Sequence, residues 1–244
     1  MTDAPLLIET QALTKAYDLL VVLRKLDLHV QRGEFVALLG PNGSGKSTLL
    51  RLLSGLTRPT GGRILIGGWE IPREAAAVRA QIGMVSHKVL LYENLTALEN
   101  LRFFARLYAI PPAEAEARAR ARLDQVGLAR RADSLVRTFS RGMQQRLSIA
   151  RALLHDPDVL LLDEPYTGLD QDASLTLDGL LRQAHAEGRT IVMSTHQLER
   201  AAEIASRVLI LSRGSVGYDA PAAALSGLAL AAEYTRVTSL AASR

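Results

Sequence analysis

The sequence predicts an α/β fold with a parallel-sheet core, an antiparallel β subdomain beside it and a helical insert. Short apolar runs bounded by turn residues alternate with stretches of helical period, which is typical of strands joined by crossover helices. The first 30 residues differ, because strand-like stretches follow one another there with no helix between them. Residues 97–155 differ in the opposite sense, since they are predicted to be almost continuously helical.

Each predicted core strand is a run of mainly aliphatic residues with few polar interruptions. The runs lie at residues 34–39, 64–66, 82–85, 158–162, 190–194 and 207–211. Apolar residues at consecutive positions predict strands that are buried on both faces, as in a parallel sheet covered by helices. The stretch 6–30 is predicted to form the small antiparallel layer.

Helical patterns occupy the segments between these strands, at residues 46–54, 97–109, 113–126, 141–154, 173–187 and 197–205. Pro111 and Pro112 precede one of these helices and Gly127 follows it, which is the usual punctuation of a helix. The residues after 215 are rich in alanine and weakly patterned, and predict no function. We expect a single domain over 1–244, with 1–86 and 156–220 forming the core and its β layer, 87–155 a helical subdomain and 221–244 a C-terminal tail.

Composition narrows the classes of function. The net charge of +4 arises from 29 basic and 25 acidic residues without a Lys/Arg block, so nucleic acid is not an expected partner. The absence of cysteine excludes disulfides and thiolate metal sites. The start, MTDAPLLIETQ, lacks the pattern of a signal peptide, and the apolar runs are too short to cross a bilayer. These features predict a cytoplasmic chain.

The strongest motif is GPNGSGKS, which matches GxxxxGK[ST] between a predicted strand and a predicted helix. Its glycines allow successive backbone N–H groups to converge on an anion. Lys46 is expected to contact the β- and γ-phosphates of a nucleoside triphosphate, and Ser47 to ligate Mg²⁺. The predicted nucleotide-binding residues of this loop are Gly40, Pro41, Asn42, Gly43, Ser44, Gly45, Lys46, Ser47 and Thr48.

A second motif, VLLLDEP, places two carboxylates at the end of an apolar strand. Open α/β sheets bind ligands at this end of their strands. Asp163 is expected to hold Mg²⁺ through water, and Glu164 to polarise an attacking water. By itself the pair could be a solvated strand end, but together with the phosphate loop it favours hydrolysis over phosphoryl transfer to a second substrate.

The third motif is FSRGMQQRLSIARALL, in which Ser140 has the position of a helix N-cap and Gly142 allows close backbone approach. Local pattern alone would make it a capped amphipathic helix and no more. Its position, 23 residues before Asp163, gives it further meaning.

Together these motifs resemble the ATP-binding domain of ABC transporters. FSRGM is similar to the LSGGQ-type signature of that family, and TGLD (Thr167 to Asp170) and the His196 of VMSTHQ follow in the family's order, so the resemblance covers residues 6 to about 220. It implies a P-loop NTPase (RecA-like) core, ATP and Mg²⁺ as ligands, and ATP hydrolysis. It also implies head-to-tail pairing of two copies of this chain, or of this chain with a related ATPase subunit.

The resemblance also implies roles for individual residues. Ser140 and Gly142 would bind the γ-phosphate of the ATP held by the opposite subunit, and Asp170 would couple the two sites across the interface. His196 would contact the γ-phosphate and the attacking water, which makes Lys46, Glu164 and His196 the expected catalytic set. Tyr17 matches the aromatic residue that stacks on adenine, although a lone tyrosine can equally serve packing.

Three positions depart from the family pattern. Arg141 replaces the first glycine of the signature pair and Met143 its glutamine. His87 occupies the position of a glutamine that ligates Mg²⁺ through its amide oxygen. Because imidazole is a poorer ligand than oxygen for Mg²⁺, we expect a water-mediated or absent contact between His87 and the metal.

The context of His87, the segment LTALENLRFFARLY and SRGMQQRL resemble the ATP-binding subunits of haem exporters in cytochrome c biogenesis, although LTALENL also occurs in drug and lipid exporters. The resemblance implies integral membrane transport subunits as partners and a peripheral location on the inner face of the cell membrane. The apolar cluster Leu90, Leu91, Tyr92 and Leu95 is expected to receive a cytoplasmic helix of that partner. Leu95, Leu98 and Leu101 could instead form the core of the insert.

Two other functions compete with a transport ATPase. A soluble ABC protein acting on nucleic acid or ribosomes would be expected to carry tandem ATPase domains, a coiled-coil insert or basic extensions, and none is present in this sequence. A nucleotide-binding regulator without turnover remains open because of the substitutions at His87, Arg141 and Met143.

Overall fold

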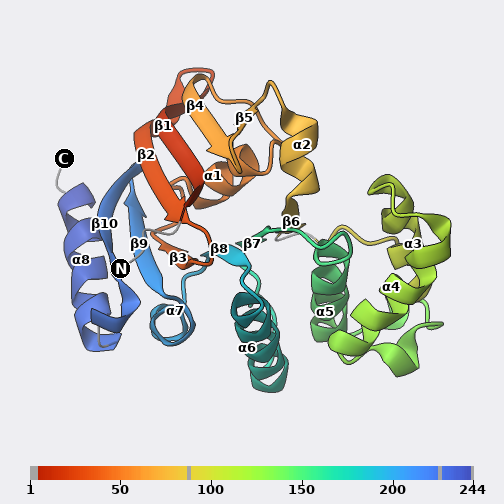
Figure 1. The fold of residues 1–244 in the computed structure, drawn as a ribbon. Helices are drawn as coiled ribbons and strands as arrows, with labels where there is room; N and C mark the ends of the chain where they lie inside the picture. Colours follow the sequence, from red (N-terminus) through yellow and green to blue (C-terminus); the bar gives the residue numbers. More distant parts are fainter. Residues whose placement is uncertain (1–4, 87–88, 225–226, 243–244) are drawn as a thin grey trace.

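The computed structural model describes residues 5–86, 89–224 and 227–242, which form two β-sheets with helices packed around them (Figure 1). The larger sheet has the strand order β10-β9-β3-β8-β7-β6. Its strands are β3 (Phe35–Leu39), β6 (Ile82–Val85), β7 (Val159–Asp163), β8 (Thr190–Ser194), β9 (Arg207–Ser212) and β10 (Ser215–Pro221). All neighbours pair in parallel except β9 and β10, which form an antiparallel hairpin. The predicted α/β core is therefore confirmed.

The second sheet is antiparallel, with the order β2-β1-β4-β5. It contains β1 (Leu6–Tyr17), β2 (Leu20–Gln31), β4 (Gly61–Ile66) and the short β5 (Trp69–Ile71). The prediction that residues 64–66 join the parallel sheet is wrong, because Ile64 pairs antiparallel with Thr10 of β1. Ile64 and Ile66 are buried while Leu65 is only half-buried, so the run is one face of an alternating strand.

The core consists of three clusters of buried side chains packed around the larger sheet. Helix α1 (Lys46–Leu53) is packed between the two sheets, where its four leucines meet Val36 and Leu38 of β3. On the other face of β3, Phe35 packs with α6 (Gln171–Ala186) and α5 (Arg141–Ala152). This alternation along one five-residue strand explains why β3 is buried at every position.

The helical subdomain, with α3 (Ala97–Leu107) and α4 (Pro112–Gln125) beside α5, lies at the opposite end of the molecule from the C-terminal helix (Figure 1). The short α2 (Ala75–Ala80), which precedes β6, was not predicted. The expectation of almost continuous helix over 97–155 is wrong between α4 and α5, where two 3₁₀ turns occur, Ala129–Arg131 and Val136–Thr138. Carbonyls of Ala132 and Ser134 accept from the first backbone N–H groups of α3, so this segment satisfies a helix start instead of forming a helix.

The C-terminal residues form α8 (Gly227–Ala242), which packs against α7 (Leu198–Ile204) and the β9–β10 hairpin. Leu230 and Val237 are buried in this contact. At Gly217 of β10 a Cβ atom would lie 2.5 Å from Val237, so the absence of a side chain permits the close approach. Within the described part of the chain, no helix is long and apolar enough to span a membrane.

His155, a half-buried histidine, is a residue whose protonation should weaken the fold. His155 stacks on Tyr108 with ring centres 3.8 Å apart, and its Nε2 lies 3.0 Å from the carbonyl oxygen of Ile82. Burial lowers the pKa of His155 to about 4. Because this value lies below the pKa of about 6.5 in an unfolded chain, protons bind the unfolded state preferentially as the pH falls from 6.5 towards 4.

We therefore expect the wild-type chain to lose about 1–2 kcal/mol of unfolding free energy between pH 7 and pH 5 through His155. In His155→Gln this loss should be smaller, as measured by urea unfolding at the two pH values. His29→Gln is the matched control, since the His29 side chain is 54% exposed. An equal pH dependence in all three chains would contradict the assignment.

Candidate functional site

The phosphate loop connects β3 to α1, and its backbone conformation requires glycine. Gly40, Gly43 and Gly45 have φ values of 144°, 79° and 109°, which L side chains rarely adopt. At Gly40 a Cβ would also lie 2.3 Å from the carbonyl oxygen of Leu211, and at Gly45 2.6 Å from Leu23. The loop therefore forms the N–H-lined turn that the motif predicts, and α1 begins directly after it at Lys46.

Lys46 lies across this loop. Its ammonium Nζ donates to the carbonyl oxygens of Gly40 at 2.7 Å and Pro41 at 3.2 Å. Burial lowers the pKa of Lys46, while the carboxylates of Glu164 and Asp163 act in the opposite direction. The ammonium is thus partly desolvated and held by neutral acceptors, ready to exchange them for a stronger anionic partner.

The loop lines a cavity of about 340 Å³. Its polar wall consists of residues 42–48 and Glu164, and Leu20 and Val22 of β2 supply an apolar wall. The sequence analysis did not identify these two apolar residues. The hydroxyl Oγ of Ser44 is buried without a hydrogen-bond partner in the described part of the chain, as expected of a group that awaits a ligand.

The end of β7 meets the start of α1 through oxygen atoms that suit a hard cation. Ser47 donates its hydroxyl to Oδ1 of Asp163 at 2.8 Å, and Ser194 at the end of β8 donates to the same oxygen at 2.8 Å. Hydroxyl and carboxylate oxygens are the ligands that Mg²⁺ prefers. Ser47 and Asp163 therefore fit the predicted metal site. No group of three or more His, Cys, Asp or Glu side chains that could hold a metal occurs in residues 5–86, 89–224 and 227–242.

Glu164 and His196 are brought together from the ends of β7 and β8. The Nδ1 atom of His196 lies 2.8 Å from Oε2 of Glu164. The Glu164 backbone has a φ of 51°, in the left-handed region, and its N–H donates to the carbonyl oxygen of Ser194 at 3.2 Å and to its Oγ at 3.0 Å. Ser194 was not predicted, although its place directly before Thr195 and His196 at a strand end was a usable signal.

The signature segment begins α5, and Ser140 is its N-cap, accepting from the N–H of Met143 at 3.2 Å. A Cβ on Gly142 would lie 2.9 Å from that of Ala173 in α6, so the glycine permits close packing of the two helices. A Cβ on Gly168 would lie 3.7 Å from Cγ of Arg141, so the stem of this arginine passes beside the TGLD turn. Ser140 and Gly142 do not line the phosphate-loop cavity of their own chain.

The remaining predicted residues are placed as follows. Asp170 is the N-cap of α6, where its Oδ1 accepts from the N–H of Ala173 at 2.8 Å. Tyr17 is 43% exposed at the end of β1, with the ammonium of Lys15 4.7 Å from its ring centre. His87 lies outside the described residues, and the expectation for its contact with Mg²⁺ stays a prediction.

Comparison with known proteins agrees with this geometry. The profile of the ABC transporter family matches residues 23–167. The chain is 41% identical over 208 residues to the Nod factor export ATP-binding protein I of Cupriavidus pinatubonensis, covering 85% of this chain and 64% of that protein's length. It is 35% identical over 210 residues to the linearmycin resistance ATP-binding protein LnrL of Bacillus subtilis, covering 86% of this chain and 68% of that one.

Solved structures match over nearly the whole fold. A dimeric ATP-binding cassette in a post-hydrolysis state, bound to ADP and Pi, is 31% identical with a TM-score of 0.81 over 88% of this chain and 98% of its own. An ATP-binding subunit of an ABC transporter is 34% identical with a TM-score of 0.84 over 95% and 99%. The phosphate loop, the paired carboxylates, the capped signature helix and these likenesses agree: the chain belongs to the ABC transporter family, as an ATP-binding cassette.

Proposed function

We propose that this chain hydrolyses Mg²⁺-ATP as the energy-converting subunit of a membrane exporter. The observation that carries the proposal is the 2.8 Å contact between Glu164 and His196 at the rim of the phosphate-loop cavity. A carboxylate and an imidazole in contact form a pair that can accept and orient the proton of an attacking water.

In the proposed mechanism the loop N–H groups and Lys46 bind the β- and γ-phosphates, with Lys46 leaving the carbonyls of Gly40 and Pro41. Ser47 and Asp163 would hold Mg²⁺, which, when bound, neutralises charge that develops on the phosphate oxygens. Glu164 accepts the proton of the attacking water. His196 contacts the γ-phosphate and, through Nδ1, holds the Glu164 carboxylate in place.

The proposed catalytic unit is a head-to-tail dimer of this chain, or a pair with a related ATPase subunit. The signature residues do not line the phosphate-loop cavity of their own chain, which supports a pairing in which they reach the γ-phosphate held by a second subunit. The α5 N-terminus, capped by Ser140, would then supply a second anion-binding group. Asp170 and the TGLD turn would lie at the interface, and Tyr17 would stack on the adenine.

The proposed contact with the membrane partner is an apolar groove of about 190 Å³ between the core and the helical subdomain. Leu90 lines it with 53% of its surface exposed, and Tyr92 beside it is 50% exposed against Phe103 and Phe104 of α3. An amphipathic helix of the partner could bury these side chains. Leu98 and Leu101 lie in the core instead. Docking of this kind would make the chain peripheral on the inner face of the membrane.

For the cargo we propose haem, because the His87 context, LTALENLRFFARLY and SRGMQQRL resemble the haem exporters of cytochrome c biogenesis. The alternative is another exporter of the same family. It is supported by relatives named for Nod factor export and for linearmycin resistance. The cassette residues do not separate these cargoes, since the transported molecule does not contact the nucleotide site.

Affinity purification of the full chain from its native membrane tests the proposal. We expect an integral membrane protein to co-purify and to raise Mg²⁺-dependent ATP hydrolysis. Leu90→Asp should reduce the yield of this partner by about tenfold, because a buried unpaired charge is costly at an interface. Leu175→Asp, at a side chain 57% exposed on α6, is the matched control. A partner without haem-handling features would contradict haem as the cargo. Equal capture of the partner by both variants would contradict the groove as the docking site.

A further inference from the structure

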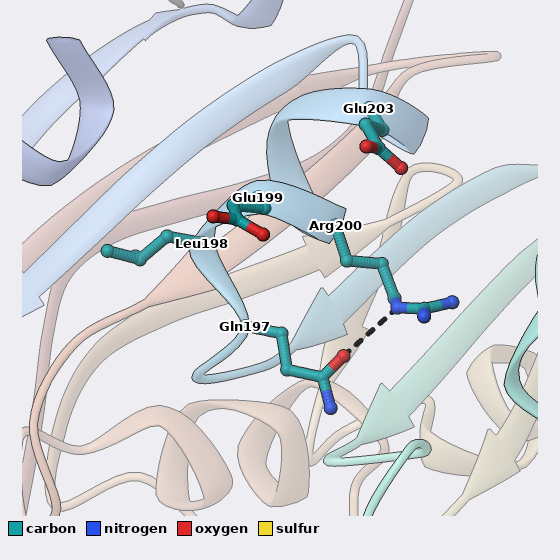
Figure 2. A pocket seen from close by; sticks show the side chains of 5 residues that line it. All are labelled: Gln197, Leu198, Glu199, Arg200 and Glu203. Atoms are coloured by element: carbon teal, nitrogen blue, oxygen red, sulfur yellow. Dashed lines mark hydrogen bonds between the residues drawn. The ribbon is translucent and has the colours of Figure 1, made fainter. Parts of the chain in front are cut away.

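Arg200 lies on α7, four residues after His196, and lines an open pocket of about 450 Å³ together with Gln197, Leu198, Glu199 and Glu203. Figure 2 shows Arg200 and Gln197 turned toward each other across the start of this helix, whereas Glu199 and Glu203 are not bonded to either. The Nε of Arg200 donates to Oε1 of Gln197 at 3.0 Å. One edge of the guanidinium is therefore hydrogen-bonded to the residue next to His196.

The same guanidinium reaches the neighbouring helix. Its Nη1 donates to the carbonyl oxygen of Ser174 at 3.4 Å and also pairs with Oδ2 of Asp178, both on α6. The Asp178 side chain is 5% exposed and that of Arg200 20%, so the ion pair is largely shielded from water. A shielded Arg–carboxylate pair has a well-defined geometry, since both groups must keep their partners.

Tyr166 completes the contact. Its hydroxyl donates to Oδ1 of Asp178 at 2.7 Å, and the guanidinium carbon of Arg200 lies 4.7 Å from the centre of its ring. Burial and the hydrogen bond to Asp178 both raise the pKa of Tyr166 far above its usual value. The hydroxyl therefore stays protonated and remains a donor, which holds Asp178, Arg200 and Tyr166 as one unit.

This unit is attached on both sides to the Glu164–His196 pair. Tyr166 follows Glu164 by two residues within a tight turn, in which the N–H of Thr167 donates to the carbonyl oxygen of Glu164 at 3.2 Å. On the other side, Gln197 directly follows His196. Arg200 thus connects the backbone turns that carry the two members of the pair, although it touches neither side chain.

We propose that Arg200 is a positioning residue for ATP hydrolysis, which sets the distance between Glu164 and His196 through Tyr166, Asp178 and Gln197. The inference rests on the proposed function of that pair. Small displacements of catalytic groups reduce turnover without weakening substrate binding made elsewhere. Because the phosphate loop lies between β3 and α1, away from α7, nucleotide affinity should not depend on Arg200.

The test compares the steady-state kinetics of full-length variants. Removing the whole side chain would leave Asp178 buried and unpaired, so Arg200→Lys, which keeps the charge, is the variant of choice, with Tyr166→Phe as a second. We expect kcat to fall about tenfold or more in Arg200→Lys, and less in Tyr166→Phe, while KM for ATP stays within about twofold. The matched control is Arg207→Lys. Arg207 of β9 pairs with Asp219 of β10, and its side chain is 21% exposed, close to the value for Arg200.

A second measurement separates positioning from general damage to the fold. In a Glu164→Gln background, Arg200→Lys should leave the ATP-bound dimer undiminished on size-exclusion chromatography, because binding and pairing do not require the reacting geometry. Loss of that dimer, or a rise in KM equal to the fall in kcat, would overturn the inference on Arg200 and leave the proposed function standing. So would unchanged kcat in Arg200→Lys. A wild-type chain that binds ATP and never hydrolyses it, even with its membrane partner, would overturn the proposed function and this inference together.

Discussion

Replacement of Glu164 by glutamine should lower the rate of ATP hydrolysis by about 10²- to 10⁴-fold, the range expected when a general base is lost. The amide keeps the shape of the side chain, and its oxygen can still accept from Nδ1 of His196, which now lies 2.8 Å from the carboxylate. ATP should therefore bind normally. Because hydrolysis would no longer release the paired subunits, the ATP-bound dimer should accumulate.

Release of phosphate and the elution volume with Mg²⁺-ATP measure the two effects in the same preparation. Glu187→Gln provides a matched control, since Glu187 follows α6 and bonds Gln183 and Arg189, far along the helix from Asp170. It should hydrolyse ATP like wild type. If Glu164→Gln turned over at the wild-type rate, another group would have to accept the proton.

Replacement of Lys46 by alanine should lower the affinity for ATP by about 100-fold or more. A cation that donates to phosphate oxygens contributes about 1.5–3 kcal/mol for each hydrogen bond, and every 1.4 kcal/mol is tenfold in affinity. In the free protein the ammonium is partly desolvated and donates to the carbonyl oxygens of Gly40 and Pro41. The fold should therefore tolerate the loss well, with unfolding free energy near that of wild type.

Equilibrium titration with a fluorescent ATP analogue and urea unfolding check the two parts of this expectation. Arg51→Ala removes an exposed cation from the last turn of the same helix and should leave affinity unchanged. A parallel loss of affinity in both variants would point to the charge of α1 in general. A loss of stability in Lys46→Ala would mean that its carbonyl contacts are structural.

The larger sheet was predictable because its central strands are almost entirely apolar, a pattern that requires cover on both faces. The run 64–66 was assigned to the wrong sheet, since three apolar residues are too few to reveal the alternation of buried and exposed positions. The expectation of almost continuous helix over 97–155 did not distinguish residues 129–138, which lie between the predicted helices 113–126 and 141–154. Their structure depends on accepting N–H groups from α3, a contact that no local pattern contains.

The phosphate loop and the DE pair were predictable for a different reason: their chemistry depends on residues adjacent in sequence. Ser194 of β8 and Leu20 and Val22 of β2 were missed because they reach the site from strands other than those next to the two motifs. Arg200 and Asp178 lie 22 residues apart and meet only after α6 and α7 pack. Their types would otherwise indicate solvated helix faces.

The left-handed backbone at Glu164 has a consequence for how this cassette can change during evolution. A non-glycine residue at a φ of 51° carries conformational strain of order 1 kcal/mol, which glycine or asparagine would relieve. Selection for stability would therefore favour glycine or asparagine at position 164, and either substitution would remove the carboxylate proposed to accept the proton. A chain relieved of selection for turnover is under pressure to lose this carboxylate first.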